Sequence, residues 1–331
     1  MRDSKIRPGA YLLVAGAVAA ASLGGVAALN LAMDPYSYAL GKPYRLRSDV
    51  HDDVADRVPD IGTAARVQAV TRSRAPALLL GSSRMQEGFE TDPEVAFNAG
   101  EAAASLDDIL AIAEAAARRP VPPKLYVIEA TGSLEAPAAR KKTLEDGWPD
   151  PADRLLALQA THVSLHLLGH AVASPGAGRF RVDFFFPTAD RVAPARLPPK
   201  STVPPAFTPG TASPKERLAL AIRRLAEICR RTGARVVFVE LPVHPFWKDD
   251  PRVQRAVSQR MSLYRAAAMS PDAGKAGAIS VVDVSGTDLH QHIPVAADLV
   301  NWLDGLHFRP WLGLQVLKFI ESEQEIISSD E

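Results

Sequence analysis

The chain has very little cysteine and no excess of either charge. Cys229 is the single cysteine among 331 residues, which excludes an internal disulfide framework. We interpret it as a buried small apolar residue within a helix at residues 216–231. Lysine and arginine together number 38, as do aspartate and glutamate. The sequence also has no basic tract, no aromatic RNA-binding motif and no internal repeat. These absences argue against a nucleic-acid partner.

What the sequence does have is one long uncharged stretch near its start. Residues 10–33 carry no charged side chain and follow Arg2, Lys5 and Arg7. A helix of ~20 apolar residues is long enough to span a bilayer. The apolar part of a cleaved signal peptide is usually only ~7–15 residues, followed by a small-residue cleavage site. Because this stretch is longer and ends without a clear Ala-x-Ala site, we expect an uncleaved membrane anchor.

The flanking charges predict how this anchor is oriented. Basic residues before the stretch favour a cytoplasmic tail over residues 1–9, although Lys42, Arg45 and Arg47 beyond it weaken the asymmetry. We therefore expect a single-pass protein of a bacterial inner membrane, with its main domain in the periplasm. The expected units are the anchor at 10–33 and a juxtamembrane linker at 34–70. A folded domain at 71–325 and a short tail at 326–331 would follow.

Strand-length apolar runs alternate with helical segments in the folded domain. The runs lack the alternation of a half-exposed strand, so they fit parallel strands covered on both faces; they lie at 75–80, 95–98, 124–130, 235–241 and 278–284. Helices are expected at 106–119, 152–170, 215–231, 253–269 and 311–321. This order predicts an α/β fold, a three-layer α/β/α doubly wound parallel sheet.

Residues 173–209 interrupt this pattern. They are rich in proline, arginine and glycine and contain three consecutive phenylalanines at 184–186. A connection of this length without regular structure is usually a functional or a disordered segment. It could cover a site as a lid or dock on a partner or the membrane surface. A tolerated surface insertion is an equally good interpretation.

Two short motifs carry the residues for nucleophilic catalysis. Residues 81–84 (Gly-Ser-Ser-Arg) follow the first strand, and residues 304–308 (Asp-Gly-Leu-His-Phe) lie near the C-terminus. A serine hydroxyl needs an adjacent base, and the base needs an orienting group. An aspartate three residues before a histidine can hold one imidazole nitrogen while the other faces the serine. The motifs therefore predict a triad of Ser83, Asp304 and His307.

Together with Phe97-Asn98-Ala99-Gly100, these motifs resemble the SGNH (GDSL-type) hydrolase superfamily. The pattern is most similar to the membrane-anchored branch that acts on bacterial cell-envelope polymers, which includes alginate O-acetylation and teichoic-acid D-alanylation proteins. The resemblance covers about residues 75–320. It implies a flavodoxin-like SGNH fold with Ser83 as nucleophile, and Asp304 and His307 in their usual roles. We expect neither a cofactor nor a metal ion.

The resemblance also implies an oxyanion hole, which is where the chain departs from the family. The backbone N–H of Ser83 would be one donor, and Gly100 or Ala103 would supply another, depending on the alignment. The family uses an asparagine side chain as a further donor, but Ser133 stands at that place. Loss of one such donor typically slows an enzyme by ~100- to 1000-fold. The enzyme would therefore be slow, use Arg84 or another donor, or be inactive.

Several other side chains are candidates for substrate binding. Arg84 and Arg309 flank the two motifs and could hold an anionic group, or pair with structural carboxylates. His244 and Trp247 follow the fourth strand, on the same edge of the sheet as the nucleophile. Trp247 and Trp302 could stack on a sugar ring, although ordinary packing explains each equally well.

Three histidines at 162, 166 and 170 form a separate cluster. A spacing of four residues places them on one face of a helix, where two could bind zinc. The glutamate of a His-Glu-x-x-His motif is absent, however, and no carboxylate ligand is close in sequence. We therefore expect a polar helix face rather than a metal site.

Two functions follow from these observations. The first is a serine esterase or O-acyltransferase that acts through an acyl-enzyme on an acylated cell-envelope polysaccharide or a small ester. The second is an inactive protein on the same fold that helps to assemble or export an envelope polymer through contacts with envelope-assembly proteins.

Overall fold

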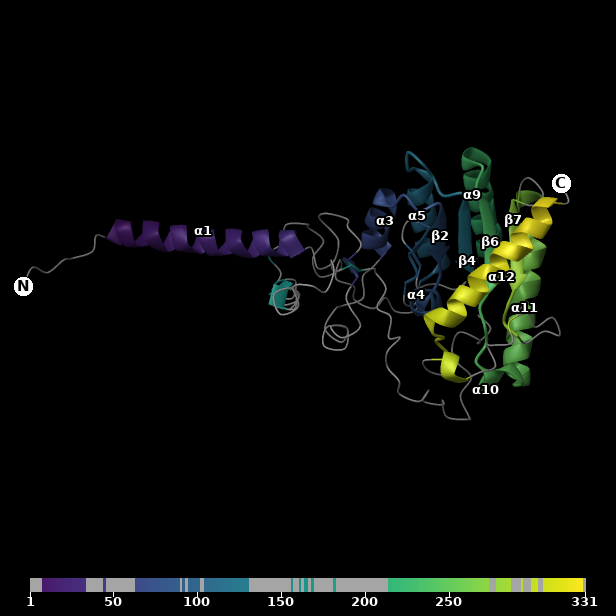
Figure 1. The fold of residues 1–331 in the computed structure, drawn as a ribbon. Helices are drawn as coiled ribbons and strands as arrows, with labels where there is room; N and C mark the ends of the chain where they lie inside the picture. Colours follow the sequence, from purple (N-terminus) through teal and green to yellow (C-terminus); the bar gives the residue numbers. More distant parts are fainter. Residues whose placement is uncertain are drawn as a thin grey trace, which may run out of the picture.

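The computed structural model describes an N-terminal helix and an α/β body. The described residues are 8–33, 44–45, 63–89, 91–92, 95–101, 104–130, 156, 161, 164–165, 168–169, 181–182, 214–273, 278–286, 293, 299–302 and 306–329. Helix α1 (Pro8–Met33) lies apart from the α/β body (Figure 1). Its segment Leu12–Met33 is long and apolar enough to cross a membrane.

Five parallel strands form the sheet of the α/β body, in the order β3-β2-β4-β6-β7. They are β2 (Ala77–Leu80), β3 (Ala96–Asn98), β4 (Leu125–Glu129), β6 (Arg235–Glu240) and β7 (Ile279–Asp283). All five predicted strands are confirmed, each slightly shorter than its apolar run. Leu79 of β2 pairs with Asn98 on one side and with Val127 on the other. The winding of the sheet reverses at β2, and doubly wound folds bind ligands beyond the strand ends at such a point.

Helices cover both faces of this sheet, which explains the continuous apolar runs. Tyr126 and Ile128 of β4 belong to one apolar cluster and Val127 to the other, because successive side chains point to opposite faces. The first cluster is covered by α3 (Thr63–Arg72), α5 (Leu106–Ala117), α9 (Pro214–Thr232) and α11 (Pro251–Ala268). The second is covered by α4 (Ser83–Gly88) and α12 (Pro310–Ser329). The α/β prediction is thus confirmed at the level of its sheet and layers.

Most predicted helices are also confirmed. The segments expected at 106–119, 215–231, 253–269 and 311–321 are α5, α9, α11 and α12. Helix α5 begins with a capping box, in which the Ser105 side chain accepts from the Asp108 N–H and the Asp108 carboxylate accepts from the Ser105 N–H. Of the helix predicted at 152–170, the described residues 156, 161, 164–165 and 168–169 are helical.

Two helices extend beyond the predicted bounds of the folded domain. Residues 63–70, expected within a linker, belong to α3, which packs against α5. Arg66 of α3 is buried, and its Nε donates to the Gly100 carbonyl at 2.8 Å. At the other end, α12 continues to Ser329, into the expected tail. Of the insertion at 173–209, the structure describes β5 (Arg181–Val182), which pairs with β1 (Tyr44–Arg45).

Candidate active site

The nucleophile turn connects β2 to α4 at the carboxyl edge of the sheet. Ser82 is the N-cap of α4, where its Oγ accepts from the Arg84 N–H at 3.3 Å, and Ser83 is the first helical residue. Glycine is required at position 81, because a Cβ there would lie 2.6 Å from the Glu129 Cβ. The small residue lets the turn pack directly against β4. This close packing fixes the position of Ser83.

The structure brings Ser83 and His307 together, although they are 224 residues apart in sequence. The Ser83 Oγ lies 2.9 Å from the His307 Nε2, a hydrogen-bond distance. His307 lies just before α12, and its neighbour Phe308 packs edge-on against Phe89 and Trp302 with ring centroids 5.5 and 6.0 Å apart. These buried rings hold the histidine beside the nucleophile turn. With Nε2 unprotonated, the imidazole can accept the serine proton.

The other side of the His307 ring faces a carboxylate that the sequence did not indicate. The Nδ1 atom lies 3.9 Å from Glu87 Oε2, and the Glu87 side chain is one-third exposed. Glu87 comes four residues after Ser83, so both side chains lie on one face of α4. The sequence motif indicates an acid only at Asp304, three residues before the histidine. Asp304, the predicted acid, lies outside the described residues.

Within the nucleophile turn, one backbone N–H has no acceptor in α4. The Ser82 N–H donates to Glu129 Oε2 at 2.7 Å, and the Arg84 N–H donates to the Ser82 side chain. The Ser83 N–H is the first of the helix, where no intrahelical carbonyl is available. Its role as an oxyanion donor stays a prediction.

The Gly100 N–H, predicted as an oxyanion donor, is bonded within the protein. It donates to the Asn98 Oδ1 at 2.9 Å. The Asn98 amide also donates to the Met85 and Phe89 carbonyls at 2.9 Å each, so this side chain joins the β3 loop to the end of α4. Asn98 and Gly100 therefore position the nucleophile helix. Ala103 and Ser133, the other predicted donors, lie outside the described residues.

Arg84 lies in a buried ion cluster and does not face solvent, which corrects its prediction as a substrate contact. Its guanidinium donates to the Pro242 carbonyl at 2.6 Å and lies 3.5 Å from Glu129 and 3.8 Å from Glu240. Arg260 donates two hydrogen bonds to Glu240, at 2.6 and 2.7 Å. Burial lowers the pKa of Arg84, against the opposing effects of Glu129 and Glu240. The cluster anchors the turn beneath Ser83.

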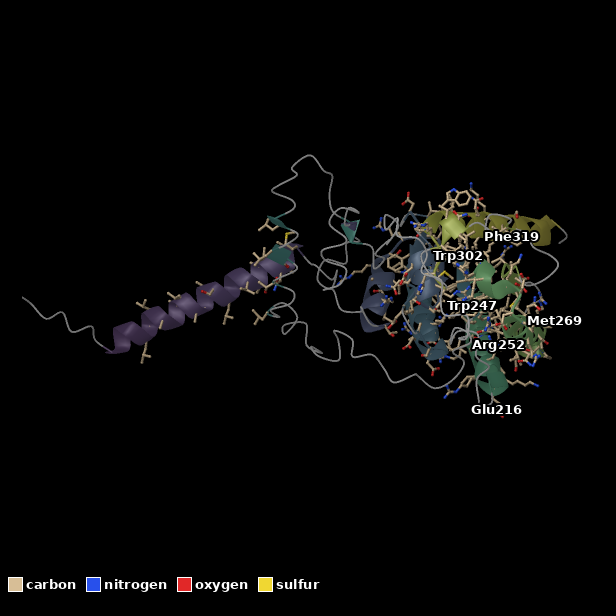
Figure 2. All side chains as sticks on the ribbon, turned by 90° about the horizontal axis from the view of Figure 1, so that it is seen from below. Glu216, Trp247, Arg252, Met269, Trp302 and Phe319 are labelled. Atoms are coloured by element: carbon tan, nitrogen blue, oxygen red, sulfur yellow. The ribbon has the colours of Figure 1, made fainter. Side chains whose placement is uncertain are left out.

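The predicted aromatic contacts belong to the core. Trp247 and Trp302 are each 1% exposed, so packing is the correct interpretation for both rings (Figure 2). His244 is equally buried, caps α10 (Pro245–Lys248) by accepting from the Phe246 N–H, and lies edge-on to Trp302. Arg309 is partly buried, and its backbone N–H donates to the Asn301 carbonyl at 2.8 Å. Its role in substrate binding stays a prediction.

The histidine cluster at 162, 166 and 170 lies outside the described residues. Within the part of the chain that the structure describes, no group of three His, Cys, Asp or Glu side chains could hold a metal ion.

No protein-family model matches this chain, and no curated protein matches it. The fold and the site define an α/β protein with a serine–histidine pair at the point where the winding of its sheet reverses.

Proposed function

We propose that this protein is a serine esterase or O-acyltransferase of the SGNH type. The observation that carries the proposal is the 2.9 Å separation between the Ser83 Oγ and the His307 Nε2. Its location strengthens the proposal, because the carboxyl edge at the switch point is where doubly wound folds bind ligands. The motif resemblance adds the substrate class, an acylated cell-envelope polysaccharide. The α1 helix would anchor the enzyme in the bacterial inner membrane, with the α/β body in the periplasm.

The reaction would proceed in two stages, acylation and deacylation, and His307 would carry the proton in each. In the first, the Ser83 Oγ attacks the ester carbonyl carbon while the His307 Nε2 takes the hydroxyl proton. The imidazolium then returns this proton to the leaving alkoxide, which leaves an acyl-serine. In the second, His307 takes a proton from water or a sugar hydroxyl, whose oxygen attacks the acyl carbon. Return of this proton from His307 to the Ser83 oxygen regenerates the enzyme and releases the acid or the new ester.

A carboxylate beside Nδ1 would stabilise the imidazolium in both stages. Glu87 is positioned for this role at 3.9 Å, and Asp304 is the acid that the motif predicts. The Ser83 N–H would donate to the oxyanion. Since the Gly100 N–H is already bonded to Asn98, we expect slow turnover unless another group supplies a second donor.

The alternative is an inactive protein on the same fold that assists envelope-polymer assembly or export through protein contacts. The occupied Gly100 N–H favours this alternative, because it removes one expected oxyanion donor.

Reaction with a fluorophosphonate distinguishes the two functions, because this probe forms a covalent bond with an activated serine. The full chain in detergent should be labelled, and Ser83→Ala should abolish the labelling. His307→Ala should slow it by at least ~100-fold, the contribution typical of a general base. If the folded wild-type chain is not labelled, the enzyme proposal is wrong.

A further inference from the structure

A second helical segment lies against the C-terminal end of α1. The Asn30 amide near the end of α1 donates to the Thr161 Oγ1 at 3.0 Å, and Asn30 is only 1% exposed. The described turns around Thr161 lie beside this end of α1 in both views, apart from the α/β body (Figures 1 and 2). In Figure 1 they are seen nearly end-on, whereas α1 lies along the picture. The segment thus crosses the end of α1.

This segment exposes leucine side chains. Leu165 and Leu168 are 54% and 39% exposed. They follow Thr161 by four and seven residues, a spacing that places all three on one side of a helix. Residues 155–178 contain no aspartate, glutamate, lysine or arginine. An uncharged segment with exposed leucines is suited to lipid more than to water.

The position of Asn30 sets the depth of these leucines. The span Leu12–Met33 ends three residues beyond Asn30, which is ~4.5 Å along a helix. The Thr161 hydroxyl would therefore lie where the apolar core of the bilayer meets the headgroups. Leu165 lies only ~6 Å from Thr161 along the second helix. Because that helix crosses α1, Leu168 remains at a similar depth.

We propose that the helical turns described at 156, 161, 164–165 and 168–169 belong to an interfacial element, which lies on the outer surface of the bilayer that α1 spans and places Leu165 and Leu168 among the lipid chains. The inference rests on the proposed membrane anchoring by α1. Since the segment has no lysine or arginine, its contact with lipid at neutral pH should not require anionic headgroups, unlike that of a basic amphipathic helix. It would give the protein a second membrane contact beside its anchor.

The test places a fluorescent probe at single sites of the full chain in lipid vesicles. Cysteines replace Leu165, Leu168, Val18 or Leu220 in a Cys229→Ala background, and each carries an NBD group. Val18 reports on α1, in which it is 60% exposed, and Leu220 is a matched control on α9, where it is 50% exposed. Quenching by doxyl-labelled phosphatidylcholine is compared with quenching by aqueous iodide.

We expect the probes at 165, 168 and 18 to be quenched by the lipid and protected from iodide, with the reverse at 220. The result should be the same in neutral vesicles and in vesicles with added phosphatidylglycerol. If the probe at 18 is in lipid but those at 165 and 168 behave like that at 220, the interfacial element is wrong and the anchor stands. If the probe at 18 is also exposed to iodide, the anchor itself is wrong, and the inference falls with it.

Discussion

At the scale of single residues, the main question is which of two carboxylates pairs with His307. Glu87 lies 3.9 Å from Nδ1, whereas Asp304 is the partner predicted from the histidine motif. An acid on the nucleophile helix would move with Ser83. An acid on the histidine loop would move with the base. The two arrangements therefore respond differently to substitution.

We expect Glu87→Gln to slow fluorophosphonate labelling by roughly 10-fold, since loss of a charge at this distance near the surface removes about 1–2 kcal/mol from the imidazolium. The labelling rate would be measured on the full chain from samples quenched at successive times. Asp304→Asn is the matched control, because it removes the same charge from the other candidate. A large effect of Asp304→Asn together with none from Glu87→Gln would assign the role to Asp304 instead.

Residue types and their spacing predicted the nucleophile and the base but not their surroundings. Ser83 and His307 stand in short motifs that are read directly from the chain. Glu87 and Asn98 act across space, on α4 and at the end of β3, so their roles depend on how these elements pack. Arg84 and Trp247 were predicted as substrate contacts because they lie near the sheet edge in sequence. Sequence proximity does not reveal that their side chains turn into the core.

At the scale of elements, the Asn98 side chain joins α4 to the end of β3. It donates to the carbonyl of Met85 in α4 and to that of Phe89 directly after the helix, and it accepts from the Gly100 N–H. The short helix carries both Ser83 and Glu87, so this attachment contributes to the geometry of the site, together with the buried ion cluster of Arg84.

Asn98→Asp should therefore loosen α4 while retaining the acceptor for Gly100. Two carbonyls would lose their donors, each at a cost of about 1–3 kcal/mol when buried. We expect a lower urea midpoint and slower labelling of Ser83. Asn98→Ala, which also removes the acceptor, should destabilise the protein further. Unchanged stability and labelling in Asn98→Asp would show that the helix is held by other contacts.

Helix α11 begins at a charged cap whose effect depends on pH. Hydrogen bonds from the Arg252 side chain, and then from its backbone N–H, lower the pKa of Asp250 to about 2. An unfolded aspartate has a pKa of about 3.9. The folded state therefore binds fewer protons, and the stabilisation is present above about pH 4 and lost as the pH falls toward 2.

Asp250→Asn should consequently lower the stability at pH 6, and its difference from wild type should shrink between pH 4 and 2. Urea unfolding at a series of pH values measures this difference. Asp249→Asn removes the same charge from the neighbouring residue outside the cap and serves as control. A difference that stays constant down to pH 2 would contradict the proposed cause.

The elements themselves were largely predictable because their patterns are strong. The inner strands β2, β4 and β6 are buried on both faces and show as continuous apolar runs, and α5 is marked by its capping box at Ser105. Helix α3 was missed because Arg66, Arg72 and the polar residues between them give the segment the composition of a linker. The buried role of Arg66 depends on a carbonyl at Gly100, which only the folded chain brings close.

At the scale of the whole molecule, the ion cluster joins the nucleophile turn to the far side of the sheet. Arg84 reaches Glu129 on β4 and Glu240 on β6, and Arg260 on α11 completes the cluster. Burial raises the pKa of Glu240, against the opposing effect of Arg260. Removing Arg260 would leave less positive charge beside the buried Glu240 carboxylate to offset the cost of its burial.

Arg260→Met should thus destabilise the protein by about 3–5 kcal/mol at pH 7, as expected when one partner of a buried pair is lost. Because the raised pKa means that folding favours protonated Glu240, the loss should diminish as the pH falls toward about 4. Chemical unfolding at both pH values tests this. The double variant Arg260→Met with Glu240→Leu should recover stability. A loss independent of pH would argue that packing, not charge, explains the effect.

The packing of Phe308 against Phe89 and Trp302 has a consequence for when the site forms during synthesis. The base is synthesised 224 residues after the serine, and it meets the serine only when these three aromatic rings are packed together. A nascent chain would therefore have no working site until this aromatic packing had formed. If the anchor enters the membrane first, that event would fall after export, so the chemistry would begin only in the compartment where the α/β body comes to rest.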